Sequence, residues 1–297
     1  MLPLIIAYHV RSGVAALNVV TAALEADART QGAEVRFAKS PAEVARFAAE
    51  APSALVAWSF YSPDFIAIGR ALREVKELAP GLRHVAGGVH ATAEPRAVLD
   101  AGFDWVAVGE GEASFVELVA NLAAGGDGRG LRGFAYRDGA GRFVTHGPAE
   151  RHPLDRYPAF HARYGKWNAI EITRGCIYAC TFCQTPYMFK ARFRHRSVEN
   201  VREHVVAMGG SGRYVRFVSP TSLSYGSDDE RVNLPAVEAL LEAVRGAVGP
   251  RGQVYFGTFP SEVRPEHVSP AALALLRRLA TNRSLVIGAQ SGSERVL

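Results

Sequence analysis

The chain has 297 residues, a net charge of +5, a hydrophobic content of 48% and a charged content of 21%. These proportions are typical of a globular protein with a substantial core. They exclude an intrinsically disordered chain, and the length suits two domains or one large one. No apolar run approaches the roughly 20 residues that a membrane-spanning helix needs, so we expect no membrane partner. The small basic excess leaves a weak preference for anions open beside the simpler interpretation, a solvated surface.

In the first half of the chain, short apolar runs alternate with amphipathic segments. Strands are predicted over 4–8, 34–38, 54–59, 82–86 and 105–108. Helices are predicted over 14–24, from Ser40-Pro41, from Ser62-Pro63 to Gly81, over 94–100 and over 112–123. Ser40, Pro41 and Glu43 have the spacing of a capping box with proline at the first helical position. The alternation predicts a parallel, doubly wound sheet that binds ligands at the carboxyl ends of its strands.

Glycine and polar residues follow several of these predicted strands. The third strand leads into Ser59-Phe60-Tyr61-Ser62, and the fourth into Gly87-Gly88-Val89-His90. Two consecutive glycines remove two side chains where a strand meets its loop, so a large ligand can approach the backbone there. Tight turns use glycine pairs as often, so this pair alone does not decide between the two uses.

A glycine-rich segment, 125–130, ends this pattern. A β-hairpin is predicted over 131–136 and 142–146, and a proline-containing connector then runs to about residue 166. We therefore expect domains at 1–126 and 167–297, joined by a hairpin and linker over 127–166.

The second half again alternates strands with helices. Strands are predicted over 169–173, 214–218, 253–258 and 284–289. Helices are predicted after Ser197, after Asn233 and after Ser269. The basic tract Lys190–Arg196 suits a solvated surface or an arm over an anionic ligand; without a partner element it does not predict nucleic-acid binding.

All three cysteines of the chain, Cys176, Cys180 and Cys183, lie in one loop after the strand at 169–173. Three thiolates in one short loop cannot all pair as disulfides, but they can bind three irons of a 4Fe–4S cluster and leave the fourth iron open. Three ordinary thiols are the alternative, although chance would scatter so few cysteines along the chain. Clustered thiols without a secretion signal also predict a reducing, cytoplasmic location.

The pattern Cys176-x-x-x-Cys180-x-Phe182-Cys183 resembles the signature of the radical S-adenosylmethionine (SAM) superfamily. The resemblance implies that SAM chelates the open iron and that Phe182 lies beside it. An electron from a donor such as flavodoxin or ferredoxin would then cleave SAM to methionine and a 5′-deoxyadenosyl radical. The segment after 284–289 resembles the family's ribose-binding segment, which implies SAM contacts for Gln290, Ser291 and Ser293. Glu262 and Arg264 could reach SAM or the substrate, or could form a structural salt bridge.

A second resemblance covers the first half. Ser59-x-x-Ser62, Gly87-Gly88-x-His90-Ala-Thr and the segment 108–112, Val-Gly-Glu-Gly-Glu, are similar to the cobalamin-binding domain that precedes many radical SAM cores. The resemblance implies cobalamin contacts for Ser59, Ser62, Gly87, Gly88 and His90. The first loop departs from the Asp-x-His-x-x-Gly motif of cobalamin proteins. His9 could still supply a lower axial ligand, or it is an ordinary loop histidine.

The expected fold class is therefore α/β. It comprises an N-terminal doubly wound parallel sheet of the cobalamin-binding, Rossmann-like type and a partial (β/α) radical SAM barrel. The family's core has more β/α units than this chain contains, so we expect a chain truncated after the fourth strand, with that strand poorly protected. The expected function is cobalamin-dependent radical SAM chemistry on a small-molecule substrate, with C-methylation as the leading outcome. Rearrangement or cyclisation without cobalamin, and an inactive partner protein that binds the cofactors, remain alternatives. No catalytic side chain is assigned.

Overall fold

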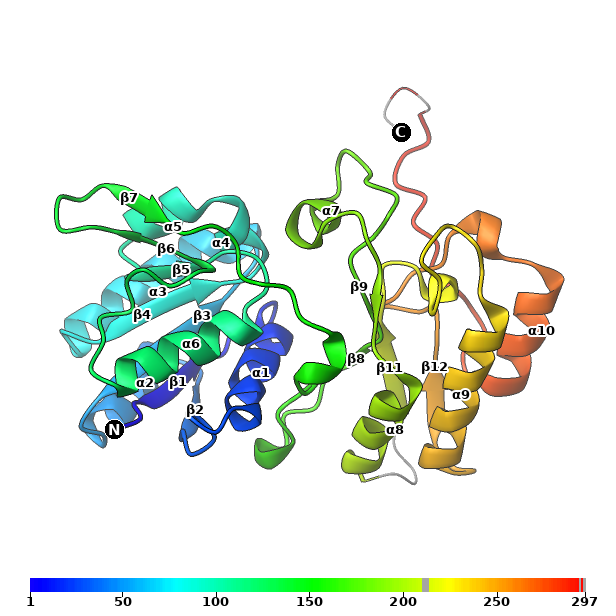
Figure 1. Ribbon diagram of the computed structural model, residues 1–297, viewed down its shortest axis with the longest axis horizontal. Coiled ribbons are helices and arrows are strands. Elements are labelled where there is room, and N and C mark those ends of the chain that lie inside the picture. Colours follow the sequence, from blue (N-terminus) through cyan, green and yellow to red (C-terminus); the bar gives the residue numbers. More distant parts are fainter. Residues whose placement is uncertain (210–213, 294, 296–297) are drawn as a thin grey trace. The chain divides into compact units, whose positions relative to one another are not determined.

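The computed structural model describes residues 1–209, 214–293 and 295 (Figure 1). The chain forms two compact units. The first unit comprises Met1–His152 with Arg156–His161, and the second comprises Pro153–Asp155 with the described part of Ala162–Leu297. No described helix combines the length and hydropathy needed to cross a membrane.

The first unit is built on a seven-stranded sheet with the order β2-β1-β3-β4-β5-β6-β7. Its strands are β1 (Leu4–Tyr8), β2 (Val35–Ala38), β3 (Ala54–Ser59), β4 (Arg83–Gly87), β5 (Trp105–Ala107), β6 (Phe134–Arg137) and β7 (Phe143–Thr145). Neighbours among β1 to β5 are parallel, as predicted for a doubly wound fold. The predicted position of the hairpin is wrong: β6 pairs antiparallel with β5, so the hairpin extends the first sheet and is not part of a linker.

Five helices of the first unit occupy the crossovers between its parallel strands: α1 (Val14–Ala23), α2 (Pro41–Ala49), α3 (Phe65–Leu78), α4 (Val89–Ala93) and α5 (Pro95–Asp100). Helix α6 (Glu112–Ala123) connects β5 to the antiparallel β6. The N-cap predicted at α2 is confirmed, since Ser40 Oγ accepts a hydrogen bond from the Glu43 amide. The Glu43 carboxylate accepts its bond from the Lys39 amide, one residue before the Ser40 amide that a capping box uses. Helix α1 packs beside α6, and α2 beside α3. The short helix α4, which directly follows Gly88, was not predicted.

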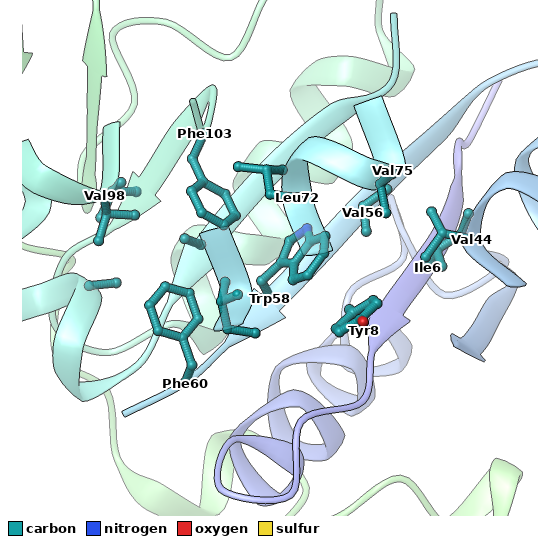
Figure 2. Close-up of a cluster of buried hydrophobic side chains, with 14 of the residues drawn as sticks. Ile6, Tyr8, Val44, Val56, Trp58, Phe60, Leu72, Val75, Val98 and Phe103 are labelled. Atoms are coloured by element: carbon teal, nitrogen blue, oxygen red, sulfur yellow. The ribbon is translucent and has the colours of Figure 1, made fainter. Parts of the chain in front are cut away.

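One face of the first sheet forms a core with α2, α3 and α5. Because side chains alternate along a strand, Ile6, Val56 and Trp58 share this face. Figure 2 shows the Trp58 ring between Tyr8, on which it stacks at 4.1 Å between ring centroids, and Phe103, which it meets edge-on at 5.8 Å. This buried aromatic packing anchors the carboxyl ends of β1 and β3, where the candidate ligand loops begin.

The second unit contains a parallel sheet with the order β12-β11-β8, formed by β8 (Ile170–Glu171), β11 (Tyr214–Val218) and β12 (Gln253–Tyr255). A separate antiparallel pair joins β9 (Thr173–Arg174) to β10 (Arg194–His195). The helices are α7 (Gln184–Phe189), α8 (Val198–Ala207), α9 (Leu234–Val248) and α10 (Pro270–Leu279). Ser197, Asn233 and Ser269 cap α8, α9 and α10, as predicted. Short 3₁₀ helices lie at Leu24–Ala26, Ser62–Asp64, Leu154–Arg156, Ala162–Tyr164, Ser222–Ser224 and Pro265–His267.

Two strand predictions in this unit are wrong. The strand expected over 169–173 is divided between β8 and β9, which pair with different partners. The described residues 284–289 form no strand. There, Val286 donates a hydrogen bond to the Gly257 carbonyl and accepts one from the Val263 amide. A strand needs a continuous ladder, and these bonds at one residue do not form one.

Candidate functional site

The cysteine loop follows β9 directly. Gly175, at its start, has a φ of +82°, in the left-handed region that favours glycine. A Cβ at this position would lie 2.0 Å from the Arg192 carbonyl oxygen. The loop therefore packs against the segment that enters β10, and glycine is required at this position both for the turn and for the close approach.

The three thiols lie in this one loop. Cys176, Cys180 and Cys183 are free and half-buried, and the Cys183 amide donates a 3.0 Å hydrogen bond to the Cys180 carbonyl. Burial raises the pKa of the Cys176 thiol, and the neighbouring Cys183 and Cys180 thiolates raise it further. Because the thiolates repel one another, a metal cluster would relieve this repulsion. Three soft sulfur donors without a fourth protein ligand fit a 4Fe–4S cluster with one open iron.

The end of the basic tract lies beside the start of this loop, because β10 pairs with β9. His195 of β10 lies with its Nδ1 3.0 Å from Thr173 Oγ1 and its Nε2 2.8 Å from the Ser227 carbonyl oxygen. Burial lowers the pKa of His195, so the neutral ring is favoured. Arg196 is buried and donates hydrogen bonds to the Glu171 carbonyl and to Asn200. These residues support the strands around the loop, and an arm over an anionic ligand is not needed to explain them.

Of the four residues predicted to contact SAM, Phe182, Gln290 and Ser293 are exposed, and Ser291 is half-buried. Phe182 has 58% of its surface exposed. Gln290 has a φ of +55°, and the Ser293 amide donates a 3.1 Å hydrogen bond to Ser291 Oγ. An exposed aromatic ring and a strained polar turn are compatible with ligand contacts, and the SAM-binding roles of these residues stay predictions.

The sequence analysis assigned no contact to the serine-rich loop after β11. The Ser219 and Ser222 hydroxyls are buried and have no hydrogen-bond partner among the described residues. Their backbones bond to Glu262, which fixes this loop to the segment after β12.

In the first unit, the predicted cobalamin residues gather at the carboxyl ends of β1, β3 and β4. A Cβ at Gly88, where φ is +93°, would lie 2.7 Å from Ser59 Oγ, and one at Gly13 would lie 1.7 Å from the Ser59 carbonyl oxygen. These glycines thus allow three strand ends to pack on one another. A Cβ at Gly87 would meet only Ala107, at an ordinary 3.6 Å, so protein packing alone does not require glycine there.

Ser62 and His90 are brought together, with the hydroxyl oxygen 2.9 Å from the imidazole Nδ1. The His90 ring is 8% exposed and lies 4.4 Å from the Phe65 ring. Burial lowers the pKa of His90, and its Nε2 has no hydrogen-bond partner in the described part of the chain. A buried ring nitrogen without a partner at this edge fits a polar group of a bound cofactor. His9 is half-buried after β1, and its amide donates a hydrogen bond to the Ala38 carbonyl.

A further group of potential metal ligands lies in the first unit. His152 Nε2 is 3.6 Å from a Glu110 carboxylate oxygen and 3.5 Å from one of Glu112, and all three side chains are buried. The sequence connected the two glutamates to the cobalamin-domain pattern but did not connect them to His152. Each of the three has additional interactions, and together they form a buried cluster of two carboxyl groups and an imidazole.

Comparisons with known proteins agree with this geometry. The model of the B12 binding domain matches residues 7–119, and the model of the radical SAM superfamily matches residues 170–297. A protein of Methanocaldococcus jannaschii, provisionally named a methylthiotransferase, is 29% identical over 259 residues, which cover 82% of this chain and 54% of that protein.

Two solved structures share the fold. The radical SAM methyltransferase TsrM from Kitasatospora setae superposes with a TM-score of 0.73 at 18% identity, covering 99% of this chain and 60% of that one. The cobalamin-dependent radical SAM enzyme OxsB gives 0.67 at 15% identity, covering 99% and 45%. The chain thus spans about half the length of these relatives.

The two matched domains are those predicted from the cysteine loop and from the strand-end motifs, in the predicted order. The α/β fold class, the enzyme family and the cofactor classes expected from the sequence are confirmed at the level of these domains. The chain belongs to the radical SAM superfamily, in the subgroup that carries an N-terminal cobalamin-binding domain.

Proposed function

We propose that this chain binds a 4Fe–4S cluster, SAM and cobalamin, and that it acts in C-methylation of a small-molecule substrate at an unactivated carbon. When bound, the cluster with SAM supplies a hydrogen-abstracting 5′-deoxyadenosyl radical, and cobalamin supplies a methyl carrier. Because the chain spans about half of its relatives, the complete reaction and its substrate belong to this proposal.

The observation that carries the proposal is the cysteine loop. Gly175 turns the chain so that Cys176, Cys180 and Cys183 present three thiols from one loop. In this proposal these residues hold the cluster, while Phe182, Gln290, Ser291 and Ser293 contact SAM. Ser59, Ser62, Gly87, Gly88 and His90 contact cobalamin. The need for a one-electron donor, such as a flavodoxin or ferredoxin, is part of the same proposal. So is a reducing, cytoplasmic location.

Methyl transfer has one competitor that the comparisons suggest, because four of the relatives are named for methylthio transfer. Sulfur insertion needs a sulfur donor, and a second cluster would need further thiolates. The only cysteines of this chain are the three in the loop. This favours methyl transfer, rearrangement or cyclisation over sulfur insertion by this chain alone.

The test is anaerobic reconstitution of the chain with iron, sulfide, SAM and cobalamin. We expect about four irons per chain, bound cobalamin in the optical spectrum, and 5′-deoxyadenosine after addition of dithionite. A Cys180→Ala variant should lose the cluster and 5′-deoxyadenosine but keep cobalamin. A parent protein with the cluster but without cobalamin would favour the cobalamin-independent alternative. Cofactor binding without 5′-deoxyadenosine would favour the inactive partner protein.

A further inference from the structure

One arginine lies directly on the cysteine loop of the second unit. The Arg264 guanidinium carbon is 3.6 Å from the centroid of the Tyr178 ring, well inside the range of a cation–π contact. Tyr178 lies between Cys176 and Cys180 in the sequence. Arg264 comes from the segment after β12, so this contact ties the cysteine loop to a distant part of the chain.

Both partners of this contact are held in place. The Tyr178 hydroxyl lies 3.2 Å from His267 Nε2. The buried His267 ring also lies 3.1 Å from the Glu230 carbonyl oxygen and 3.4 Å from Thr221 Oγ1. These contacts fix the Tyr178 ring at both its face and its hydroxyl.

Arg264 also forms an ion pair with Glu266, with 2.5 Å between its Nε and the carboxylate. The side chain of Glu266 is 51% exposed, against 34% for Arg264, so solvent screens the carboxylate more strongly than the guanidinium. Glu266 therefore orients Arg264 and offsets part of its positive charge at the cysteine loop.

The Tyr178 contact holds the Arg264 guanidinium against the loop that carries the three cysteines. The field of this cation would act on any negative charge added at the three thiolates. Reduction of a bound cluster by one electron adds such a charge, so a nearby cation favours the reduced form.

We propose that Arg264 is a positioning residue that fixes the cysteine loop through Tyr178 and raises the reduction potential of the cluster bound there. This inference rests on the proposed function, because it requires the cluster. The redox step is uptake of one electron by the oxidised cluster from an external one-electron donor, with no bond made or broken in the protein.

The test compares iron content and the midpoint potential, measured by EPR during a dithionite titration without SAM. Arg264→Gln should retain the cluster but shift its potential to more negative values, with a roughly tenfold change in the reduction equilibrium, or about 59 mV for one electron. Arg264→Lys, which keeps the charge, should restore most of the potential. Tyr178→Leu should shift it in the direction of Arg264→Gln, whereas Tyr178→Phe, which keeps the ring, should not.

Arg202→Gln is the matched control, since Arg202 forms a comparable exposed ion pair with Glu199 on α8. It should leave the potential unchanged. A fully loaded Arg264→Gln protein with the parental potential would overturn the inference. If Arg264→Gln binds no iron, the Arg264→Lys variant provides the test. A lysine variant that binds no cluster, or that does not recover the parental reduction potential, would overturn the proposed role of the charge. A parent protein without a cluster would refute the proposed function and this inference with it.

Discussion

Gly175 offers a direct test of how the cysteine loop is held. In Gly175→Ala, the new Cβ would lie 2.0 Å from the Arg192 carbonyl oxygen at a φ of +82°. The left-handed backbone costs a non-glycine residue about 1–2 kcal/mol. Relief of the clash requires a backbone shift of about 1 Å or more, and overpacking of this kind costs about 1–3 kcal/mol. The substitution should therefore destabilise the loop by about 2–5 kcal/mol.

The assay is urea unfolding together with iron per chain after anaerobic reconstitution. Gly175→Ala should lower the urea midpoint and lose most of its iron, because the turn that presents Cys176 must move. Gly165→Ala is the matched control: Gly165 has a φ of +62° but nothing within 4 Å of the added Cβ. It should show only the backbone cost of about 1 kcal/mol and should bind iron normally. Equal stability and equal iron content in both variants would refute the steric argument.

Three further outcomes are expected. Gly246→Ala, at an exposed position of α9 with open space around the added Cβ, should stabilise the chain by about 0.5–1 kcal/mol in urea unfolding, and a loss of stability would contradict this. Burial lowers the pKa of His84 to about 3, below the value near 6.5 in the unfolded chain. Its contribution to stability is therefore complete above pH 6.5 and is lost as the pH falls toward 3, by about 2 kcal/mol between pH 7 and 5. His84→Gln, which keeps an acceptor for the Trp58 indole N–H, should flatten that dependence in pH-dependent urea unfolding. Gly87→Ala should leave the urea midpoint of the cofactor-free chain unchanged, because its Cβ meets only Ala107 at 3.6 Å, but should weaken cobalamin binding in an optical titration at least tenfold.

The strands and helices whose signals are local were predicted well. Strands β1 and β3 have the predicted bounds, because each is an apolar run that turn residues end on both sides. Helix α2 begins where Ser40 Oγ accepts a hydrogen bond from the Glu43 amide, a free donor of its first turn. These features depend on residues a few positions apart, which a sequence shows directly.

The errors arose where the state of a segment depends on a distant partner. The hairpin at 134–145 gave a correct turn signal, but nothing local shows that Phe134 pairs with Ala107 of β5. Residues 284–289 have the composition of a strand yet lack a continuous ladder. Helix α4 is short, and Thr92 within it accepts a hydrogen bond from the distant Gly109 amide. Pairing of this kind is a tertiary property.

The candidate sites divide in the same way. Spacing alone identified Cys176, Cys180 and Cys183, because a cluster needs its ligands within one short loop. The contact of Arg264 with Tyr178 could not be predicted, since it joins two segments that only folding brings together. The sequence offered a ligand role and a structural salt bridge for Arg264. The structure contains the salt bridge to Glu266, and it adds the contact with the cysteine loop.

The glycines at the two candidate sites show that a glycine in a motif can be required by protein packing and not by a ligand. Gly88 belongs to a glycine pair that suggests room for a ligand, yet the Ser59 hydroxyl already lies where its side chain would be. Gly175 is required by the Arg192 carbonyl in the same way. At both positions the protein's own packing demands glycine, so the loops are fixed by contacts that require no cofactor. Loops fixed in this way need less ordering when a ligand binds, and a smaller ordering cost gives tighter binding for the same contacts. In the glycine pair, protein packing explains Gly88 but not Gly87, so only the absence of a side chain at Gly87 supports a ligand nearby.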